Sequence, residues 1–312
     1  MALTEAARGS SALDEAFDRL AASGFELPNG FVNHGPMACE ALAALGRDDE
    51  VDLWARRFAR SGGVRVEPES TVTFDWREAL GDRRRLPEWI GHFERAIADE
   101  GWRPVVAEWV PRLLPGMAVA LFHGSIRAAH AVRAIDAADT GPRRAELARA
   151  LAYWAARFAP GRPVGGALLA GVPSRDRDLL PAEDLRLAVA RVAADGARRY
   201  LTEPDILHLH GVTGAMALDL FVDHVPEAAT RAGLAQLRAE HAALYRGVTP
   251  AGEGRPFGIP AGELVRSAAE SGDPHEVKLV EACLRGLDRT ADPVFAVAAE
   301  TVTGLGGPER AA

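Results

Sequence analysis

The sequence predicts an all-α protein, a single large multi-helix domain over residues 1–312 with a metal site in its helical core. Three observations lead to this prediction. Apolar residues recur at helical spacing along most of the chain. Strand-like alternation is limited to residues 64–74 (VRVEPESTVTF), which allows at most a minor β-hairpin. Hydrophobic residues make up 48% of the chain, which is enough to fill a large core.

Helical patterns cover most of the first half of the chain. Ser11 and Asp14 are typical of a helix start, and Gly24 is typical of the end of that helix. Asn33 can cap a second helix that runs to Leu45. Further helices are expected over residues 51–58, 86–98, 104–114, 117–135 and 147–158.

The second half repeats this pattern around two stretches rich in glycine and proline. Helices are expected over residues 182–194, 213–223, 227–246, 274–287 and 293–301. The two stretches, residues 159–173 and 247–262, are interpreted as loops over the helical body, because helical patterning resumes after each. The second loop could close over a pocket as a lid.

Composition excludes several classes of protein. The formal net charge is -8 and no long run of either sign is present, which argues against nucleic acid as a partner. The longest apolar runs, such as residues 117–122, are too short to cross a bilayer, and the N-terminus has no apolar signal core. Two cysteines, Cys39 and Cys283, do not form a disulfide framework, so a reduced cytoplasmic location is expected.

The single lysine is the most informative feature of the composition. Of the 36 basic residues only Lys278 is a lysine. Arginine supplies positive charge equally well but cannot become a neutral amine. A neutral amine at Lys278 could act as a base or form a Schiff base. Alternatively, carbon dioxide could convert it into an anionic carbamate, which is a ligand for iron or zinc. An ordinary exposed lysine is the remaining interpretation.

Nine histidines are candidate metal ligands. Neutral imidazole binds Zn, Fe, Cu and Ni, and helical proteins collect such ligands from several helices. His123, Arg127 and His130 share one helix face, as do His275 and Lys278. No HExxH or CxxC motif is present, so the fold must bring the ligands together. Three histidines are expected to be structural, namely His92, His224 and His241, whereas His130 and His208 suit roles beside a ligand or substrate.

Four segments together resemble the questin oxidase-like family. They are residues 33–47 (NHGPMACEALAALGR), 123–131 (HGSIRAAHA), 210–214 (HGVTG) and 275–283 (HEVKLVEAC). They are spread over most of the chain and occur in the order expected for the family. Met37 departs from the fungal pattern, in which a second histidine is expected, and the chain is shorter than the fungal members. These departures affect the expected substrate more than the expected metal.

The resemblance implies a mostly helical oxygenase that acts on anthraquinone-type polyketides with dioxygen. Relatives are described as Baeyer–Villiger-type oxidases or as non-haem iron dioxygenases with four histidines and a carboxylated lysine. The corresponding ligands of Fe(II), or of Zn, would be His34, His123, His210, His275 and carboxylated Lys278. His130 is the rival for the fourth histidine and a candidate catalytic residue. Arg127 could hold the anionic oxygen of the substrate.

Three other functional classes remain open at this point. A carbamate and histidines also suit a zinc-dependent hydrolase. A flavin- or nicotinamide-linked monooxygenase is disfavoured because the dinucleotide fingerprint is missing, although external NADPH stays open. A non-catalytic helical binder of a hydrophobic small molecule would bind no metal and would tolerate Lys278→Arg.

Overall fold

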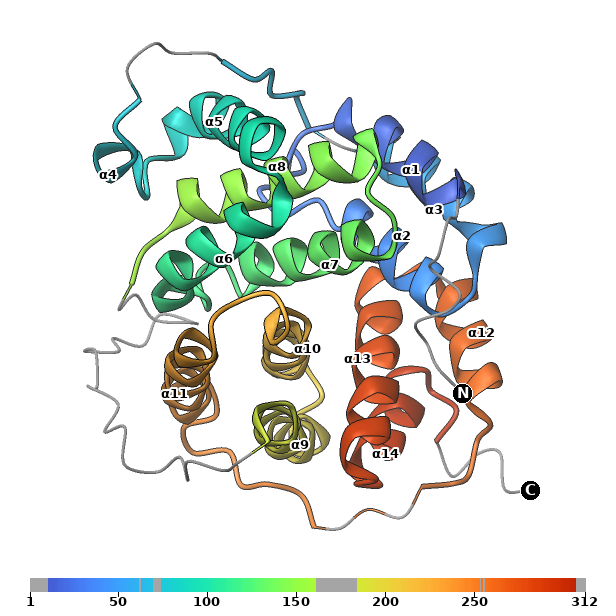
Figure 1. Ribbon diagram of the computed structural model, residues 1–312. Coiled ribbons are helices and arrows are strands. Elements are labelled where there is room, and N and C mark those ends of the chain that lie inside the picture. The colour runs from blue at the N-terminus through green and yellow to red at the C-terminus, as the bar shows by residue number, and fades with distance from the viewer. Residues whose placement is uncertain are drawn as a thin grey trace.

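The computed structural model describes residues 11–61, 63–69, 74–160, 184–252, 254 and 256–306, and this part of the chain is all-α (Figure 1). The first elements are α1 (Ser11–Ala21), α2 (Gly35–Ala44), α3 (Asp48–Ser61), α4 (Trp76–Ala79), η1 (Arg83–Arg85), α5 (Leu86–Glu100), α6 (Trp102–Leu113), η2 (Leu114–Gly116), α7 (His123–Ala137) and α8 (Gly141–Arg157). They are followed by α9 (Leu185–Thr202), α10 (Ile206–Phe221), α11 (Glu227–Leu244), α12 (Ala261–Ser271), α13 (Pro274–Thr290) and α14 (Val294–Val302). The predicted fold class is confirmed.

Helix α7 begins later than its sequence pattern predicts. The pattern favours a helix from residue 117, but α7 starts at His123. Ala120, Leu121 and Phe122 all have positive φ angles, of 53°, 57° and 62°. These values belong to the left-handed region, so a right-handed helix cannot run through these residues.

Other parts of the helix prediction also differ from the structure, and two of them have a clear cause. Helix α10 starts at Ile206, seven residues before the expected range, because the Asp205 carboxylate accepts a hydrogen bond from the His208 backbone N–H and caps the helix. Helix α12 was not predicted. Its pattern begins inside the stretch interpreted as a loop, where the glycines and prolines obscure it.

The minor β-hairpin is absent from the described residues of its segment, 64–69 and 74. The backbone around this segment forms hydrogen bonds with other parts of the chain. Gly63 N–H donates to the Glu26 carbonyl at 3.1 Å, and Glu69 N–H donates to the Pro87 carbonyl at 2.9 Å. Residues 70–73, and most of the loop expected over residues 159–173, lie outside the described residues.

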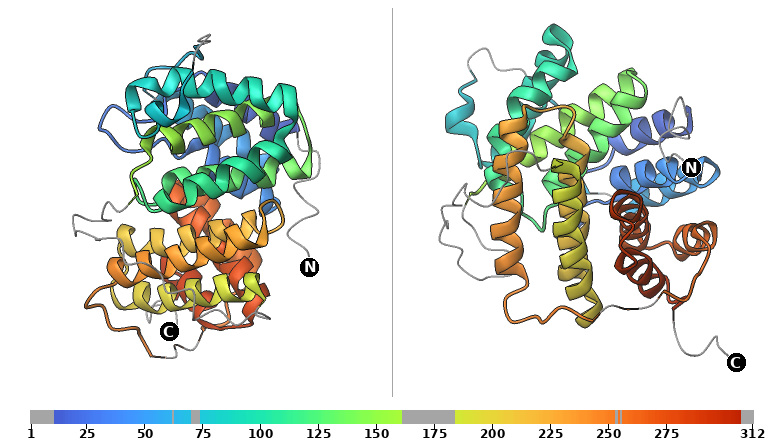
Figure 2. Two further views of the ribbon diagram at one scale, coloured as in Figure 1. Left: turned by 60° about the vertical axis from the view of Figure 1, so that its left-hand side comes forward. Right: turned by 60° about the horizontal axis from the view of Figure 1, so that its bottom comes forward.

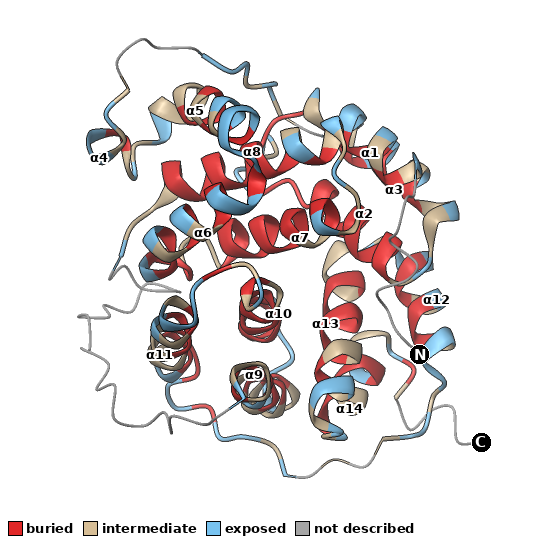
Figure 3. Ribbon diagram, viewed as in Figure 1, coloured by how far each residue is buried: buried red, intermediate tan, exposed pale blue. Residues whose placement is uncertain are grey.

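Four helices from distant parts of the sequence surround the centre of the molecule. Helix α2 packs on α7, α7 packs on α10, α10 packs on α13, and α13 packs back on α2 (Figures 1 and 2). Most residues of these four helices are buried, and every residue of α2 is buried (Figure 3). Polar side chains on them therefore need buried partners. Within the described residues, no helix is both long and apolar enough to cross a bilayer.

The end of α13 allows a direct test of backbone strain. Ala291 is exposed and adopts the left-handed conformation at the C-terminus of the helix, with φ at 54°. Glycine takes this conformation without the steric penalty of a Cβ. Ala291→Gly relieves this strain but increases the conformational entropy of the unfolded chain, which offsets part of the gain. We expect a net rise in the free energy of unfolding of about 0.5–1 kcal/mol. Urea unfolding measures this change, and a destabilised variant would contradict it.

Candidate metal centre

Four histidines converge where α2, α7, α10 and α13 meet. His34 caps α2, His123 is the first residue of α7, His275 lies in the first turn of α13, and His210 lies in the second turn of α10. The ring atoms that could bind a metal all lie within 4.8 Å of one another. The structure therefore assembles a group of four imidazoles from four separate segments. We call it the histidine group.

The spacing of the rings suits a common metal ion. His123 Nε2 lies 2.8 Å from His34 Nε2 and 3.1 Å from His210 Nε2. Two nitrogens that are each about 2.1 Å from one ion lie roughly 3 Å apart when they meet it at a right angle. Both observed distances are close to this value.

Each ring of the histidine group directs its other nitrogen, Nδ1, to an oxygen atom. These oxygens are the Val32 carbonyl for His34 (2.7 Å), the Ala120 carbonyl for His123, the Ile206 carbonyl for His210 (2.6 Å) and the Asp273 carboxylate for His275 (2.9 Å). An oxygen acceptor keeps the proton on Nδ1 and leaves the lone pair of Nε2 available. All four rings are thus held in the tautomer and orientation that a metal ligand needs.

Electrostatics keep the histidine group neutral. Burial is the largest cause in every case, and it lowers the pKa of all four imidazoles, that of His123 to about 3. The charge of Lys278 lowers each of these pKa values further. At neutral pH the rings are therefore in the form that binds metal ions.

Lys278 lies one turn after His275 on α13 and is only 1% exposed. Its Nζ atom has no hydrogen-bond partner within the described part of the chain, and neither does Nε2 of His275. Burial lowers the pKa of Lys278 to about 7. A buried ammonium next to this group would repel a cation, whereas a neutral or carboxylated amine would not. The four imidazoles make a donor set that could hold a metal ion, and Lys278 lies near enough for its charge to lower their pKa values.

Residues 31–159 match the family model described as questin oxidase-like. Over this stretch, the chain is similar to the questin oxidase-like family. The match confirms the family resemblance seen in the sequence, and it includes His34 and His123. His210 and His275 follow the matched segment, and the fold brings them to the same point. A search of curated proteins finds no match for the chain.

A strained turn inside the questin oxidase-like segment positions His123. The three left-handed residues at 120–122 cost about 1–2 kcal/mol each, because a Cβ crowds the backbone in this conformation. The turn places the Ala120 carbonyl against Nδ1 of His123. It also directs the Phe122 ring onto Gly214, where an added Cβ would lie 2.4 Å from that ring. Strain at this position is consistent with a functional constraint on His123.

Glycines beside two of the histidines allow close helix packing. Gly124 follows His123, and an added Cβ there would lie 2.9 Å from the Trp154 ring. Gly211 follows His210, and an added Cβ would lie 2.0 Å from the Tyr245 hydroxyl. Larger residues would push α7 and α10 away from the helices behind them. The same His-Gly pair occurs at His34, His123 and His210, and it is a signal of the site that is visible in the sequence.

Arg127, which the sequence suggested could hold an anionic oxygen of the substrate, is paired with a carboxylate of the protein itself. Its Nε and Nη2 donate to the two carboxylate oxygens of Glu146 on α8, at 2.6 and 2.8 Å. Both side chains are 4% exposed, and the guanidinium also lies over the Phe25 ring. Sharing a face with His123 is a local property of α7, but the partner of Arg127 comes from the neighbouring helix. The structure thus favours a structural role for Arg127.

We expect Arg127→Met to lower the free energy of unfolding by about 3–5 kcal/mol, because it leaves the Glu146 carboxylate buried without a partner. Arg127→Met/Glu146→Met should recover most of this loss. Urea unfolding of both variants measures the change. A single variant as stable as wild type would contradict the structural role.

His130 is buried but lies outside the histidine group. Its Nδ1 is hydrogen-bonded to the Glu40 carboxylate on α2. His275, not its rival His130, therefore completes the group of four. Three histidines expected to be structural, His92, His224 and His241, also lie outside it. His208 lies with Glu203 and Asp205 in a separate, more exposed group.

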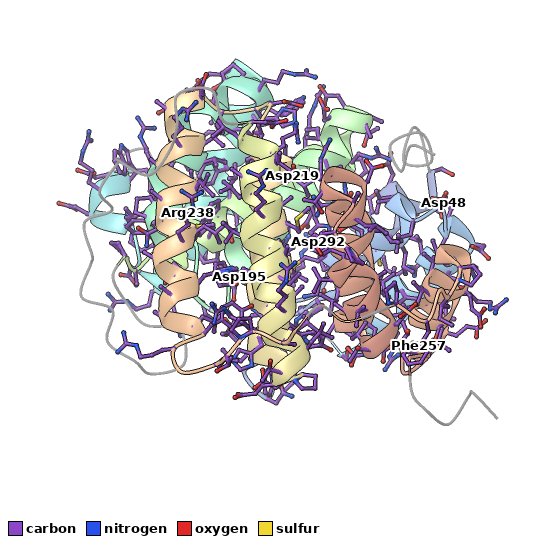
Figure 4. The ribbon with its side chains drawn as sticks, turned by 90° about the horizontal axis from the view of Figure 1, so that it is seen from below. Asp48, Asp195, Asp219, Arg238, Phe257 and Asp292 are labelled. Carbon is purple, nitrogen blue, oxygen red and sulfur yellow. The ribbon has the colours of Figure 1, made fainter. Side chains whose placement is uncertain are left out.

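The loop predicted to act as a lid is anchored in the structure. Three consecutive backbone N–H groups, those of Phe257, Gly258 and Ile259, donate to the Glu300 carboxylate on α14 at 2.9–3.1 Å (Phe257 is labelled in Figure 4). The Glu300 side chain is buried. These bonds fix this part of the loop to α14.

Proposed function

We propose that this protein is a non-haem, iron-dependent oxygenase that acts on an anthraquinone-like phenolic substrate of the aromatic polyketide type. The observation that supports this most strongly is the histidine group, in which every Nδ1 has an oxygen acceptor and the Nε2 atoms converge. The questin oxidase-like match supports an oxidoreductase. Iron, the substrate class and dioxygen as co-substrate are the parts that we propose.

The proposed ligands are His34, His123, His210, His275 and Lys278. We propose that the Lys278 amine attacks carbon dioxide, so that an N–C bond forms and one proton leaves. The product is an anionic carbamate. Its oxygen atoms would be ligands for the metal beside Nζ, which has no hydrogen-bond partner among the described residues. Its negative charge would attract the metal, whereas the ammonium of an unmodified Lys278 would repel it. Imidazoles combined with a carboxylate-like oxygen are a donor set that suits non-haem Fe(II).

The ends of the helices support anionic groups at this site. Helices α2, α7 and α13 begin at or next to His34, His123 and His275. The N-terminus of a helix carries partial positive charge and favours anions. Three such termini would stabilise both a carbamate and a phenolate substrate. The same helix termini would not stabilise the positive charge of a protonated Lys278.

The bound iron would supply activation of dioxygen for insertion into an electron-rich ring. The residues of the chain would hold and shield that chemistry. Asp273 keeps a proton on Nδ1 of His275 and orients the ring. The backbone carbonyls do the same for the other three rings. Burial of His34, His123 and His210 limits the access of bulk water to the group.

Oxygen consumption with a panel of hydroxyanthraquinones tests this function. We expect uptake by protein reconstituted with Fe(II), and none by protein treated with a chelator or loaded with Zn²⁺. Dependence on added NADPH separates a monooxygenase, which needs an external two-electron donor, from a dioxygenase, which does not. Ester or amide hydrolysis by the Zn²⁺ form, without oxygen uptake by the Fe(II) form, would contradict the proposal.

A further inference from the structure

A chain of buried ion pairs crosses the same four helices that carry the histidine group. We call it the charge network. Its members are Glu40 on α2, His130 and Arg133 on α7, Asp219 on α10, and Glu281 and Arg285 on α13. Each helix thus contributes at least one residue to the histidine group and at least one to the charge network.

Arg133 is the centre of the charge network. Its Nε and Nη2 donate to the two Glu40 carboxylate oxygens at 2.7 and 2.6 Å, and its Nη1 donates to Glu281. One guanidinium therefore joins α7 to both α2 and α13. Both carboxylates are 1% exposed. Burial acts to raise the pKa of Glu40 and Glu281, but the adjacent Arg133 outweighs it and holds both pKa values below the usual range.

Arg285 extends the charge network to α10. Its Nε donates to Glu281 at 2.6 Å, and its Nη1 donates to Asp219 at 3.1 Å and to the Met216 carbonyl at 3.0 Å. Asp219, labelled in Figure 4, is 1% exposed. Helix α13 is thereby tied to α10 as well as to α7.

The charge network lies at a similar depth along each helix. Glu40 follows His34 by six residues, Arg133 follows His123 by ten, Asp219 follows His210 by nine and Glu281 follows His275 by six. At 1.5 Å per residue these separations are roughly 9–15 Å. The charge network is therefore a second polar layer, displaced by about two to three helical turns.

The histidine group by itself offers little to hold these helices together. Its neutral rings direct Nε2 lone pairs toward one another, and Lys278 has no partner among the described residues. Burial of an ion pair often adds little net stability, because desolvation opposes the attraction, but its directional hydrogen bonds can select one arrangement. We propose that the charge network, with Arg133 at its centre, positions the metal centre by fixing the relative register of α2, α7, α10 and α13. This inference rests on the metal site proposed above.

A matched comparison separates positioning from general stabilisation. Arg143 is a second ion-paired arginine, and it is buried: it donates to Asp14 at 2.6 Å and to the Ala134 carbonyl at 2.8 Å. Its ion pair links α8 to α1, neither of which carries a residue of the histidine group. Its bond to the Ala134 carbonyl reaches α7, but eleven residues beyond His123 and outside the charge network. We compare Arg133→Met with Arg143→Met, and use Arg133→Lys to restore the charge without the two-pronged hydrogen bond.

The first measurement is the dissociation constant of Co²⁺ in competition with a chelator, alongside urea unfolding. Arg133→Met should weaken Co²⁺ binding by about 10–100-fold, which is the range found when groups that orient metal ligands are removed. Arg133→Lys should recover part of the loss. Arg143→Met should lose stability and bind Co²⁺ as wild type does. Wild-type affinity in folded Arg133→Met, or an equal loss in Arg143→Met, would overturn the inference.

The second measurement needs no metal. In chelator-treated protein, backbone hydrogen exchange should become faster in α2 and α13 of Arg133→Met, but in α1 and α8 of Arg143→Met. If wild type binds no Co²⁺ or Fe(II), the proposed function fails, and this exchange pattern alone decides whether the network fixes the four helices. If Arg133→Met does not fold, Glu281→Gln, which keeps the shape and removes one charge, replaces it in both measurements.

Discussion

Replacement of His123 by alanine is expected to weaken metal binding by roughly 100-fold or more and to abolish metal-dependent oxygen uptake. His123 is the central ring, with its Nε2 closest to those of both His34 and His210. Structural Zn²⁺ sites bind with about 10–16 kcal/mol, so one of four or five ligands contributes roughly 3 kcal/mol. Chelator competition with Co²⁺ or Fe(II) measures the loss.

His92→Ala is the control for this experiment. His92 lies among the rings of Trp89, Phe93 and Trp109, outside the histidine group. It should keep the metal affinity of wild type. The assignment would be contradicted if His123→Ala kept that affinity, or if His92→Ala lost as much.

Lys278→Met is expected to have opposite effects on stability and on function. Methionine has a similar shape but no charge and no amine. Its metal-free form should be more stable than wild type at about pH 6, on the order of 3–5 kcal/mol, because it removes a buried, unpartnered ammonium. The variant cannot form a carbamate, so its metal affinity and oxygen uptake should fall.

The stability difference should depend on pH in a defined direction. The pKa of Lys278 is about 7 in the folded protein and 10.5 in a model peptide. Between these values the unfolded chain binds more protons, so the stability of metal-free wild type rises by about 1.4 kcal/mol per pH unit relative to Lys278→Met. The advantage of the variant is thus greatest below about pH 7 and shrinks toward about pH 9.

Urea unfolding in the presence of chelator measures this pH dependence. The comparison with Lys278→Met cancels the effects of the ionisable groups whose pKa does not depend on Lys278. Lys278→Arg is the companion variant, because it keeps the charge permanently and should lose both stability and metal affinity. A stability difference that does not change with pH, or normal metal binding by Lys278→Arg, would contradict the role of Lys278.

Local patterns in the sequence were sufficient to predict most helices, whereas the members of the histidine group were predicted from the resemblance to the questin oxidase-like family. Helical periodicity depends on neighbouring residues, and the lysine could be recognised because it is the only one. The predicted start of α7 was wrong because residues 117–122 have an apolar helical pattern although they are not part of the helix. Tertiary packing of Phe122 against Gly214 replaces that pattern with a left-handed turn.

The partners of the polar residues could not be predicted in the same way. Arg127 shares a helix face with His123, yet it pairs with Glu146 on another helix. Arg133 joins residues that are 93 and 148 positions away in the sequence. Such contacts follow from how the helices pack, which no local spacing reveals. The one available signal was Glu40, an ionisable residue within the apolar run GPMACEALAA.

We propose that the histidine group and Lys278 bind iron. Elemental analysis of protein purified without chelator or affinity metal tests it most directly, combined with intact mass before and after mild acid. We expect near-stoichiometric iron and a mass increment of one carbon dioxide that acid removes and that Lys278→Met lacks. Wild-type protein with no bound metal, even after reconstitution with Fe(II), would contradict it.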